Sequence, residues 1–156
     1  MAGQTPQDNP DYWKSLALGT ARGNGSDFLL TMMPTGVGKA RILKAVEDEL
    51  GPGSVHVLVP DERNVVHYER EGLSTSAIPD KDAASADVPQ ETNLVAVMDA
   101  PALTERQVRN VTTGVPETAR LMLDHLKLPA FNDPTPRDVA VYELLRREVN
   151  PEVPRP

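Results

Sequence analysis

Short continuous apolar runs alternate along the chain with polar segments that contain glycine and proline. Residues 27–33 form a continuous apolar run with the length of a strand that is buried on both faces of a parallel sheet. Residues 54–60 predict a second strand, in which Val55, Val57 and Val59 alternate on one side, and residues 93–99 form another apolar run. The first two segments are joined by residues 38–50, whose apolar side chains recur at helical spacing and stop before Gly51. Strand, helix and strand with short connections predict a βαβ unit.

Further helices are predicted on both sides of this unit. Residues 12–18 form a short helix that carries the only tryptophan, Trp13. Residues 115–128 place Pro116 in a first helical turn and gather Leu, Met and Ala on one face, which is typical of an amphipathic helix. Residues 135–149 begin with capping-box spacing and predict a last helix.

The domain organisation expected from these elements is a single α/β domain over residues 1–149. Its core is a small, mostly parallel sheet of three or more strands with flanking helices and a helical C-terminal part. Residues 75–92 are rich in Ser, Ala, Asp and Pro without periodicity and predict a long mobile loop. The proline-rich residues 150–156 predict an extended tail.

The composition limits the cellular compartments and the classes of partner that we expect for this protein. The formal net charge is -7, which repels phosphate backbones, so we expect nucleic acid to be reached only indirectly, through a complex. There is no cysteine, and no apolar run approaches the roughly 20 residues of a membrane span. The polar start lacks the features of a signal peptide. We therefore expect a cytoplasmic protein or a component of a virus particle, without membrane association.

The candidate chemistry lies in the segment MPTGVGKA, residues 33–40, between the first apolar run and the helix. The phosphate-loop pattern G-x-x-x-x-G-K-[ST] occurs in this setting, but it requires glycine where the chain has Met33 and a hydroxyl where it has Ala40. Its glycines allow backbone N–H groups to curl around a phosphate of ATP or GTP, and the lysine would reach the outer phosphates. The candidate phosphate-binding residues are Thr35, Gly36, Val37, Gly38, Lys39 and Ala40.

Alanine at position 40 has no oxygen to hold the magnesium ion that bridges the outer phosphates. We therefore expect hydrolysis of a nucleoside triphosphate to be impaired more than its binding. The remaining residues supply neither a metal-ligand spacing nor a Gly-x-Ser-x-Gly nucleophile elbow, so no catalytic or metal residue is assigned. His56, His67 and His125 are interpreted as structural histidines, with His67 on an exposed helix.

Residues 28–105 resemble the first domain of superfamily-2 helicases, particularly the flavivirus type. The resemblance rests on FLLTMMPTGVGKA, VHVLVPDERNVVHYEREGL and NLVAVMDAPALTE, which occur in the family's order. It matches Gly36, Gly38 and Lys39 to the loop glycines and lysine of the family. It implies a fold that binds and hydrolyses nucleoside triphosphates and handles nucleic acid.

The departures from the family pattern fall on its catalytic atoms. Ala40 replaces the magnesium-binding threonine. In the acidic box Asp99 matches the aspartate, but Ala100 stands in the place of the glutamate and Ala102 in that of the histidine. The resemblance therefore implies a degenerate NTPase fold, stripped of its metal and water chemistry.

Three functions remain open at this point. The leading one is a non-catalytic or weakly catalytic accessory or assembly protein that acts within a larger complex, such as a viral, nucleic-acid-handling or packaging complex. It would bind a protein partner or form a homo-oligomer, such as a homodimer. The second is an active, magnesium-dependent NTPase or phosphotransferase, in which Thr35 or a partner replaces the missing hydroxyl. The third is an α/β scaffold without a ligand.

The sequence also gathers basic residues around the loop, which form either a positive patch or a set of charges that balance local acids. These residues are Arg22, Lys39, Arg41 and Lys44.

Overall fold

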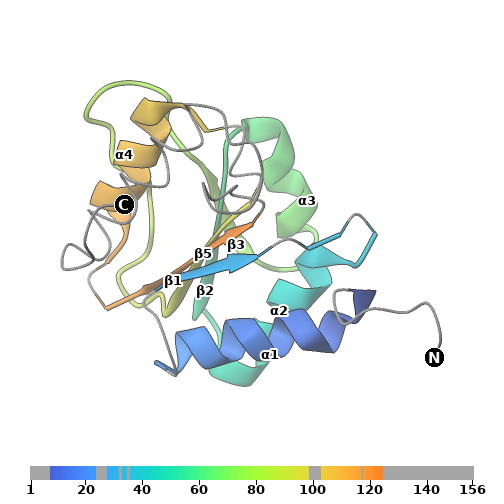
Figure 1. Ribbon diagram of the computed structural model, residues 1–156. Coiled ribbons are helices and arrows are strands. Elements are labelled where there is room, and N and C mark those ends of the chain that lie inside the picture. Colours follow the sequence, from blue (N-terminus) through green and yellow to red (C-terminus); the bar gives the residue numbers. More distant parts are fainter. Residues whose placement is uncertain are drawn as a thin grey trace, which may run out of the picture.

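The computed structural model shows helices and strands alternating along the chain (Figure 1). It describes residues 8–23, 28–31, 33–34, 36–98, 103–116 and 118–124. The helices are α1 (Pro10–Ala21), α2 (Lys39–Leu50), the 3-10 helix η2 (Glu62–Asn64), α3 (Val65–Glu69) and α4 (Glu105–Gly114). The strands are β1 (Phe28–Thr31), β2 (Val55–Val59), β3 (Ser74–Ala77), β4 (Leu94–Val97) and β5 (Arg120–Asp124).

The strands form one parallel sheet in the order β1-β5-β4-β2-β3. Every pairing is parallel, and the connections from β1 to β2, from β2 to β3 and from β4 to β5 each carry a helix. The α/β fold class predicted from the sequence is therefore confirmed. The register pairs Thr31 of β1 with Asp124 of β5, so the carboxyl ends of these two strands lie side by side.

The helices cover both faces of the sheet (Figure 1). On one face, Trp13 of α1 and Leu43 of α2 belong to a core cluster with Val57 of β2. On the other face, Val108 of α4 belongs to a second cluster with Leu58 of β2. Because both faces are covered, β2 is buried at every position, which explains why all its residues except His56 are apolar.

Local signals set the ends of the helices near the loop. At α1, Asn9 is the N-cap, and its side chain accepts a hydrogen bond from the Asp11 N–H at 2.9 Å. Pro10 occupies the first turn, where a missing N–H costs nothing. At α2, Gly51 ends the helix with a φ of 114°, a conformation that glycine adopts readily. The helices predicted around Trp13 and over residues 38–50 are confirmed.

The predicted loop over residues 75–92 is partly wrong. Residues Ser74–Ala77 form the edge strand β3, which is short and polar and lacks the apolar pattern that identifies a buried strand. Residues 78–92, called the strap from here on, have no regular structure, but they pack against α4. Ile78, Ala86 and Val88 of the strap are buried in the same cluster as α4.

The predicted helix over residues 115–128 is wrong where the structure describes it. Arg120–Asp124 forms β5, a strand in the interior of the sheet. The apolar run of this segment fits either a buried strand or a helix face, and only its pairing with β1 and β4 decides between them. The preceding helix is α4, which begins with a capping box between Thr104 and Gln107.

The predicted helix over 135–149 and the predicted tail over 150–156 lie outside the described residues. In the part of the chain that is described, no helix is both long enough and apolar enough to span a membrane.

Asn110 of α4 holds the strap in place. Its side-chain Nδ2 donates hydrogen bonds to the carbonyl oxygens of Pro79 and Lys81, at 2.7 and 2.8 Å. Its Oδ1 accepts a hydrogen bond from the Ala84 N–H at 3.1 Å. The Asn110 side chain is buried, so these bonds replace the water that would otherwise satisfy the strap backbone.

Replacing Asn110 by alanine is expected to lower the free energy of unfolding by about 2 kcal/mol, because it removes the hydrogen bonds between a buried side chain and the partly buried backbone of the strap. Urea denaturation followed by circular dichroism measures this change. Asn93→Ala is the matched control, since the Asn93 side chain is exposed, and its effect should stay within about 0.5 kcal/mol. Equal effects of the two substitutions would contradict a fastening role for Asn110.

Candidate functional site

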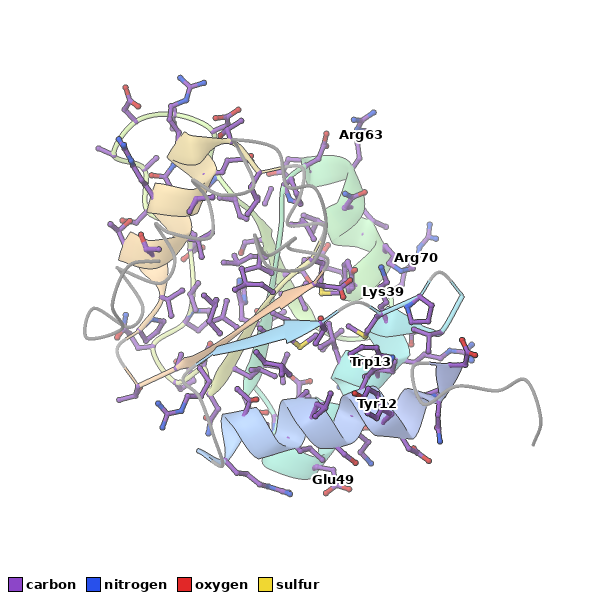
Figure 2. The ribbon with its side chains drawn as sticks, viewed as in Figure 1. Tyr12, Trp13, Lys39, Glu49, Arg63 and Arg70 are labelled. Atoms are coloured by element: carbon purple, nitrogen blue, oxygen red, sulfur yellow. The ribbon has the colours of Figure 1, made fainter. Side chains whose placement is uncertain are left out.

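The candidate site is the turn between β1 and α2, at the carboxyl ends of the parallel strands. Ligands of open α/β folds commonly bind at this edge of the sheet. The turn includes Gly36, Val37 and Gly38, and α2 begins directly afterwards at Lys39. Figure 2 shows Lys39 beside the end of β1. The strand-before, helix-after setting predicted from the sequence is therefore present.

The two glycines of the turn are used for their conformational freedom. Gly36 and Gly38 have φ values of 86° and 87°, in the left-handed region that residues with a side chain rarely adopt. Gly38 is the N-cap of α2 and offers no side chain to its first turn. The turn thus has the backbone freedom that a phosphate loop needs, and the start of α2 favours negative charge beside it.

Lys39 faces a carboxylate that the sequence interpretation did not include in the site. Its Nζ lies 3.1 Å from Oδ2 of Asp124, at the end of β5. Asp124 is fully buried, whereas the Lys39 side chain keeps 22% of its exposure. Segment RLMLD was interpreted as part of a helix, although an apolar run ending in an acid was the available signal for a strand that delivers a carboxylate to this edge.

The other oxygen of Asp124 ties the carboxylate to β1. Oδ1 accepts a hydrogen bond from Thr31 Oγ1 at 2.8 Å and another from the Met33 backbone N–H at 3.1 Å. The side chain of Met33 is also fully buried, so the residue in place of the first motif glycine belongs to the core. Asp124 therefore joins the end of β1 to the start of α2.

Ala40 continues α2 after Lys39, and its methyl group is buried in the core cluster on that face of the sheet. No side-chain oxygen is present where the phosphate-loop pattern places the magnesium-binding hydroxyl. The remaining motif positions, Thr35 in the loop and Asp99, Ala100 and Ala102 in the acidic box, lie outside the described residues.

The basic residues around the turn are paired with carboxylates and do not form an open positive patch. Lys39 contacts Asp124, as described above. The other pairs are Arg22 with Glu49 at 3.6 Å, Arg41 with Glu71 at 3.7 Å, and Lys44 with Glu47 at 3.0 Å and Asp48 at 3.7 Å. Of the two predictions for these residues, the structure supports the balancing of local acids.

A hollow of about 360 Å³ lies beside the turn, between the starts of α1 and α2. Val37 and Ile42 contribute apolar surface to it, and Lys14 and Arg41 stand on its walls. The hollow and the glycine turn are contiguous, because Gly36 and Gly38 line both. A ligand whose phosphate lies on the turn would therefore extend its remaining atoms into this space.

Neither of the two histidines that the structure describes lines this turn or its hollow. His56 of β2 is buried, with Nδ1 at 2.7 Å from Ser74 Oγ and Nε2 at 3.0 Å from Ser76 Oγ, so it links β2 to the edge strand β3. His67 is exposed on α3, as predicted, and His125 lies outside the described residues. Among the described residues, no group of three or more His, Cys, Asp or Glu side chains is placed to hold a metal ion.

The stability of the protein should fall as the pH drops below neutral because of His56. Burial lowers the pKa of His56, and the nearby Asp87 carboxylate only partly opposes this effect. Below the pKa of about 6.5 that His56 has in the unfolded chain, the unfolded chain binds a proton more readily than the folded protein does. The stability that neutral His56 contributes is therefore complete above this pKa and is lost as the pH falls toward the lower pKa of the folded protein. The slope in this window is at most about 1.4 kcal/mol for each pH unit, which corresponds to the uptake of one proton on unfolding.

Urea denaturation at a series of pH values between 7.5 and 5 tests this prediction. His56→Gln should remove most of the slope below about pH 6.5, whereas the exposed His67 serves as the control, and His67→Gln should leave the slope in place. A slope that survives in His56→Gln would assign the pH dependence to other groups.

No protein-family model matches this chain, and no curated protein matches it in sequence.

Proposed function

We propose that this chain is a non-catalytic or weakly catalytic accessory protein, built on an α/β domain with a degenerate phosphate loop. It would act within a larger complex, through a protein partner or as a homo-oligomer, and would meet nucleic acid only through that complex. The observation that carries this proposal is the state of the loop lysine. Lys39 is engaged by the buried Asp124, and the next residue is an alanine whose methyl group belongs to the core.

Efficient hydrolysis of a nucleoside triphosphate needs a magnesium ion that neutralises charge on the outer phosphates. In the phosphate-loop pattern, the hydroxyl after the lysine holds that ion. Ala40 has none, and its burial leaves no room for a larger polar side chain without disturbance of the core. These facts support an accessory role over turnover.

A turnover assay tests the proposal directly. Purified protein with ATP and magnesium should release negligible phosphate, and size-exclusion chromatography with light scattering should show a homo-oligomer or a complex with a partner. Robust turnover that disappears in Lys39→Ala, with that variant shown to be folded at the assay temperature, would overturn the accessory role.

One observation favours the second candidate, a magnesium-dependent NTPase or phosphotransferase. The left-handed glycines and the start of α2 still form a turn of the kind that receives phosphate. In this case Thr35 or a side chain from a partner would supply the missing magnesium ligand. Titration calorimetry with ATP separates the candidates, because binding that strengthens with magnesium indicates an NTPase. A scaffold without a ligand would show no binding under either condition.

A further inference from the structure

Asp124 already engages the lysine ammonium group that a phosphate would need at this turn. Phosphate loops bind their ligand through backbone N–H groups and a lysine ammonium group. Here the Met33 N–H donates to Asp124 Oδ1 at 3.1 Å, and Lys39 Nζ lies 3.1 Å from Oδ2. We propose that Asp124 is an internal anion that holds Lys39 and keeps a latent phosphate site closed, so that the contact is autoinhibitory. This inference rests on the proposed degenerate phosphate loop and concerns the regulation of the same turn.

The charge balance around the turn supports this inference. A phosphate loop attracts its ligand through an excess of positive charge. In the described structure, the loop lysine is neutralised by Asp124, and Arg41 on the first turn of α2 lies 3.7 Å from Glu71. Lys14, on the wall of the adjoining hollow, lies 3.3 Å from Glu49. A phosphate approaching the turn therefore meets paired charges and gains little attraction from them.

The burial of Asp124 makes the exchange of its partner unfavourable. If Lys39 moved from the carboxylate to a phosphate, Asp124 would lose the cation beside Oδ2 while a second anion arrived close to it. Loss of one partner of a buried ion pair is strongly unfavourable, and a like charge nearby adds repulsion. Pyrophosphate, which carries several charges, should be excluded most strongly.

The backbone of the turn is already tightly bent, and one of its N–H groups, that of Val37, donates to the Pro34 carbonyl oxygen at 3.3 Å. Gly36 and Gly38 already have left-handed φ values. Apart from the two neighbouring residues in the chain, no atom lies within 4 Å of a Cβ built on Gly36. The contiguous hollow of about 360 Å³ offers space beyond the turn. What closes the site is the charge of one side chain, so removal of that charge should open it.

Asp124→Asn is the direct test, because asparagine is isosteric and keeps an oxygen that accepts the hydrogen bonds of Thr31 and Met33. Titration calorimetry with inorganic pyrophosphate should show weak binding to the natural chain and binding at least about tenfold tighter to Asp124→Asn. The gain should disappear in the double variant Lys39→Met, Asp124→Asn, since the released ammonium group is its source.

The outcomes separate this inference from the proposed function. Binding by Asp124→Asn that is no tighter than that of the natural chain would overturn the inference, while the accessory role would still depend only on the turnover assay. Robust ATP turnover by the natural chain would overturn the accessory role, whatever Asp124→Asn does.

A measurement on the natural chain keeps the inference testable if Asp124→Asn does not fold. Nuclear magnetic resonance of the ¹⁵N-labelled lysine ammonium groups should show the Lys39 signal unchanged when micromolar pyrophosphate is added. A shift of that signal at micromolar pyrophosphate would mean that Lys39 exchanges its partner readily, and the autoinhibitory contact would be rejected.

Discussion

Replacing Gly114 by alanine is expected to lower the free energy of unfolding by about 2–3 kcal/mol, although alanine is the better helix former. Gly114 is the last residue of α4, where the helix meets the backbone of the strap. A Cβ at this position would overlap the carbonyl oxygen of Ala86, and it would lie 2.8 Å from the nitrogen and 2.9 Å from the carbonyl carbon of the same residue. Backbone atoms cannot rotate away as a side chain can, so the strap must move.

That movement would also strain the Ala86 N–H bond to the carbonyl oxygen of Asn110, which is 2.8 Å long. Thermal and urea denaturation of Gly114→Ala measure the loss. Gly19→Ala in α1 is the matched control, because no atom lies within 4 Å of its Cβ. It should raise stability by roughly 0.5–1 kcal/mol through helix propensity alone. If Gly114→Ala were as stable as Gly19→Ala, the close contact between α4 and the strap would be wrong.

Hydrophobic patterns predicted those parts of the fold whose local and tertiary signals agree. The segment that forms α2 has helical spacing, a glycine stop and apolar residues that the sheet then buries, so propensity and packing indicate the same structure. The runs that form β1, β2 and β4 were predicted as strands for the same reason. The parallel arrangement followed from the helix between β1 and β2.

The predictions failed where a segment takes its structure from distant partners. Strand β3 has almost no apolar signal, and it forms because its backbone pairs with β2 and because Ser74 and Ser76 contact His56. The strap was predicted to be a mobile loop because its order comes from contacts with α4, which include hydrogen bonds with the side chains of Asn110 and Gln107. No property of residues 78–92 themselves could have predicted these contacts.

Helix α4 is a different case, because its signal was present. The spacing of Thr104 and Gln107 is a capping box, and the structure forms both of its hydrogen bonds. The sequence pattern predicted a helix over the following residues, 115–128, and none over α4, because Pro116 suits a first helical turn. In the structure Pro116 precedes β5, so the proline marks a connection between a helix and a strand.

The candidate site could be predicted only in part. The glycine turn and the position of Lys39 follow from a local pattern, and the structure places them at the carboxyl ends of the strands. Asp124 lies 85 positions further along the chain than Lys39, and it reaches the site only because β5 pairs with β1. Because β5 was predicted as a helix, the sequence alone could not place Asp124, the partner of Lys39, in the site.

Lys39→Met is expected to lower the free energy of unfolding by about 2–3 kcal/mol, because it removes the cation from a fully buried carboxylate. A phosphate-loop lysine that points into solvent would contribute little to the stability of the ligand-free protein. The prediction therefore distinguishes a lysine engaged in the fold from one that is held ready for a ligand. Urea denaturation in buffer without phosphate or nucleotide measures it.

Lys14→Met is the matched control, because Lys14 also pairs with a carboxylate, but this carboxylate, that of Glu49, is exposed to solvent and not buried. Its Nζ lies 3.3 Å from Glu49 Oε1, and the two side chains are 30% and 45% exposed. Such a surface pair contributes about 0–1 kcal/mol, so Lys14→Met should be nearly neutral. The double variant Lys39→Met, Asp124→Asn should recover part of the stability lost in Lys39→Met, since it also removes the buried charge. If Lys39→Met lowered the free energy of unfolding no more than Lys14→Met does, Lys39 would be available to bind a phosphate. That result would favour the magnesium-dependent NTPase or phosphotransferase over the accessory role.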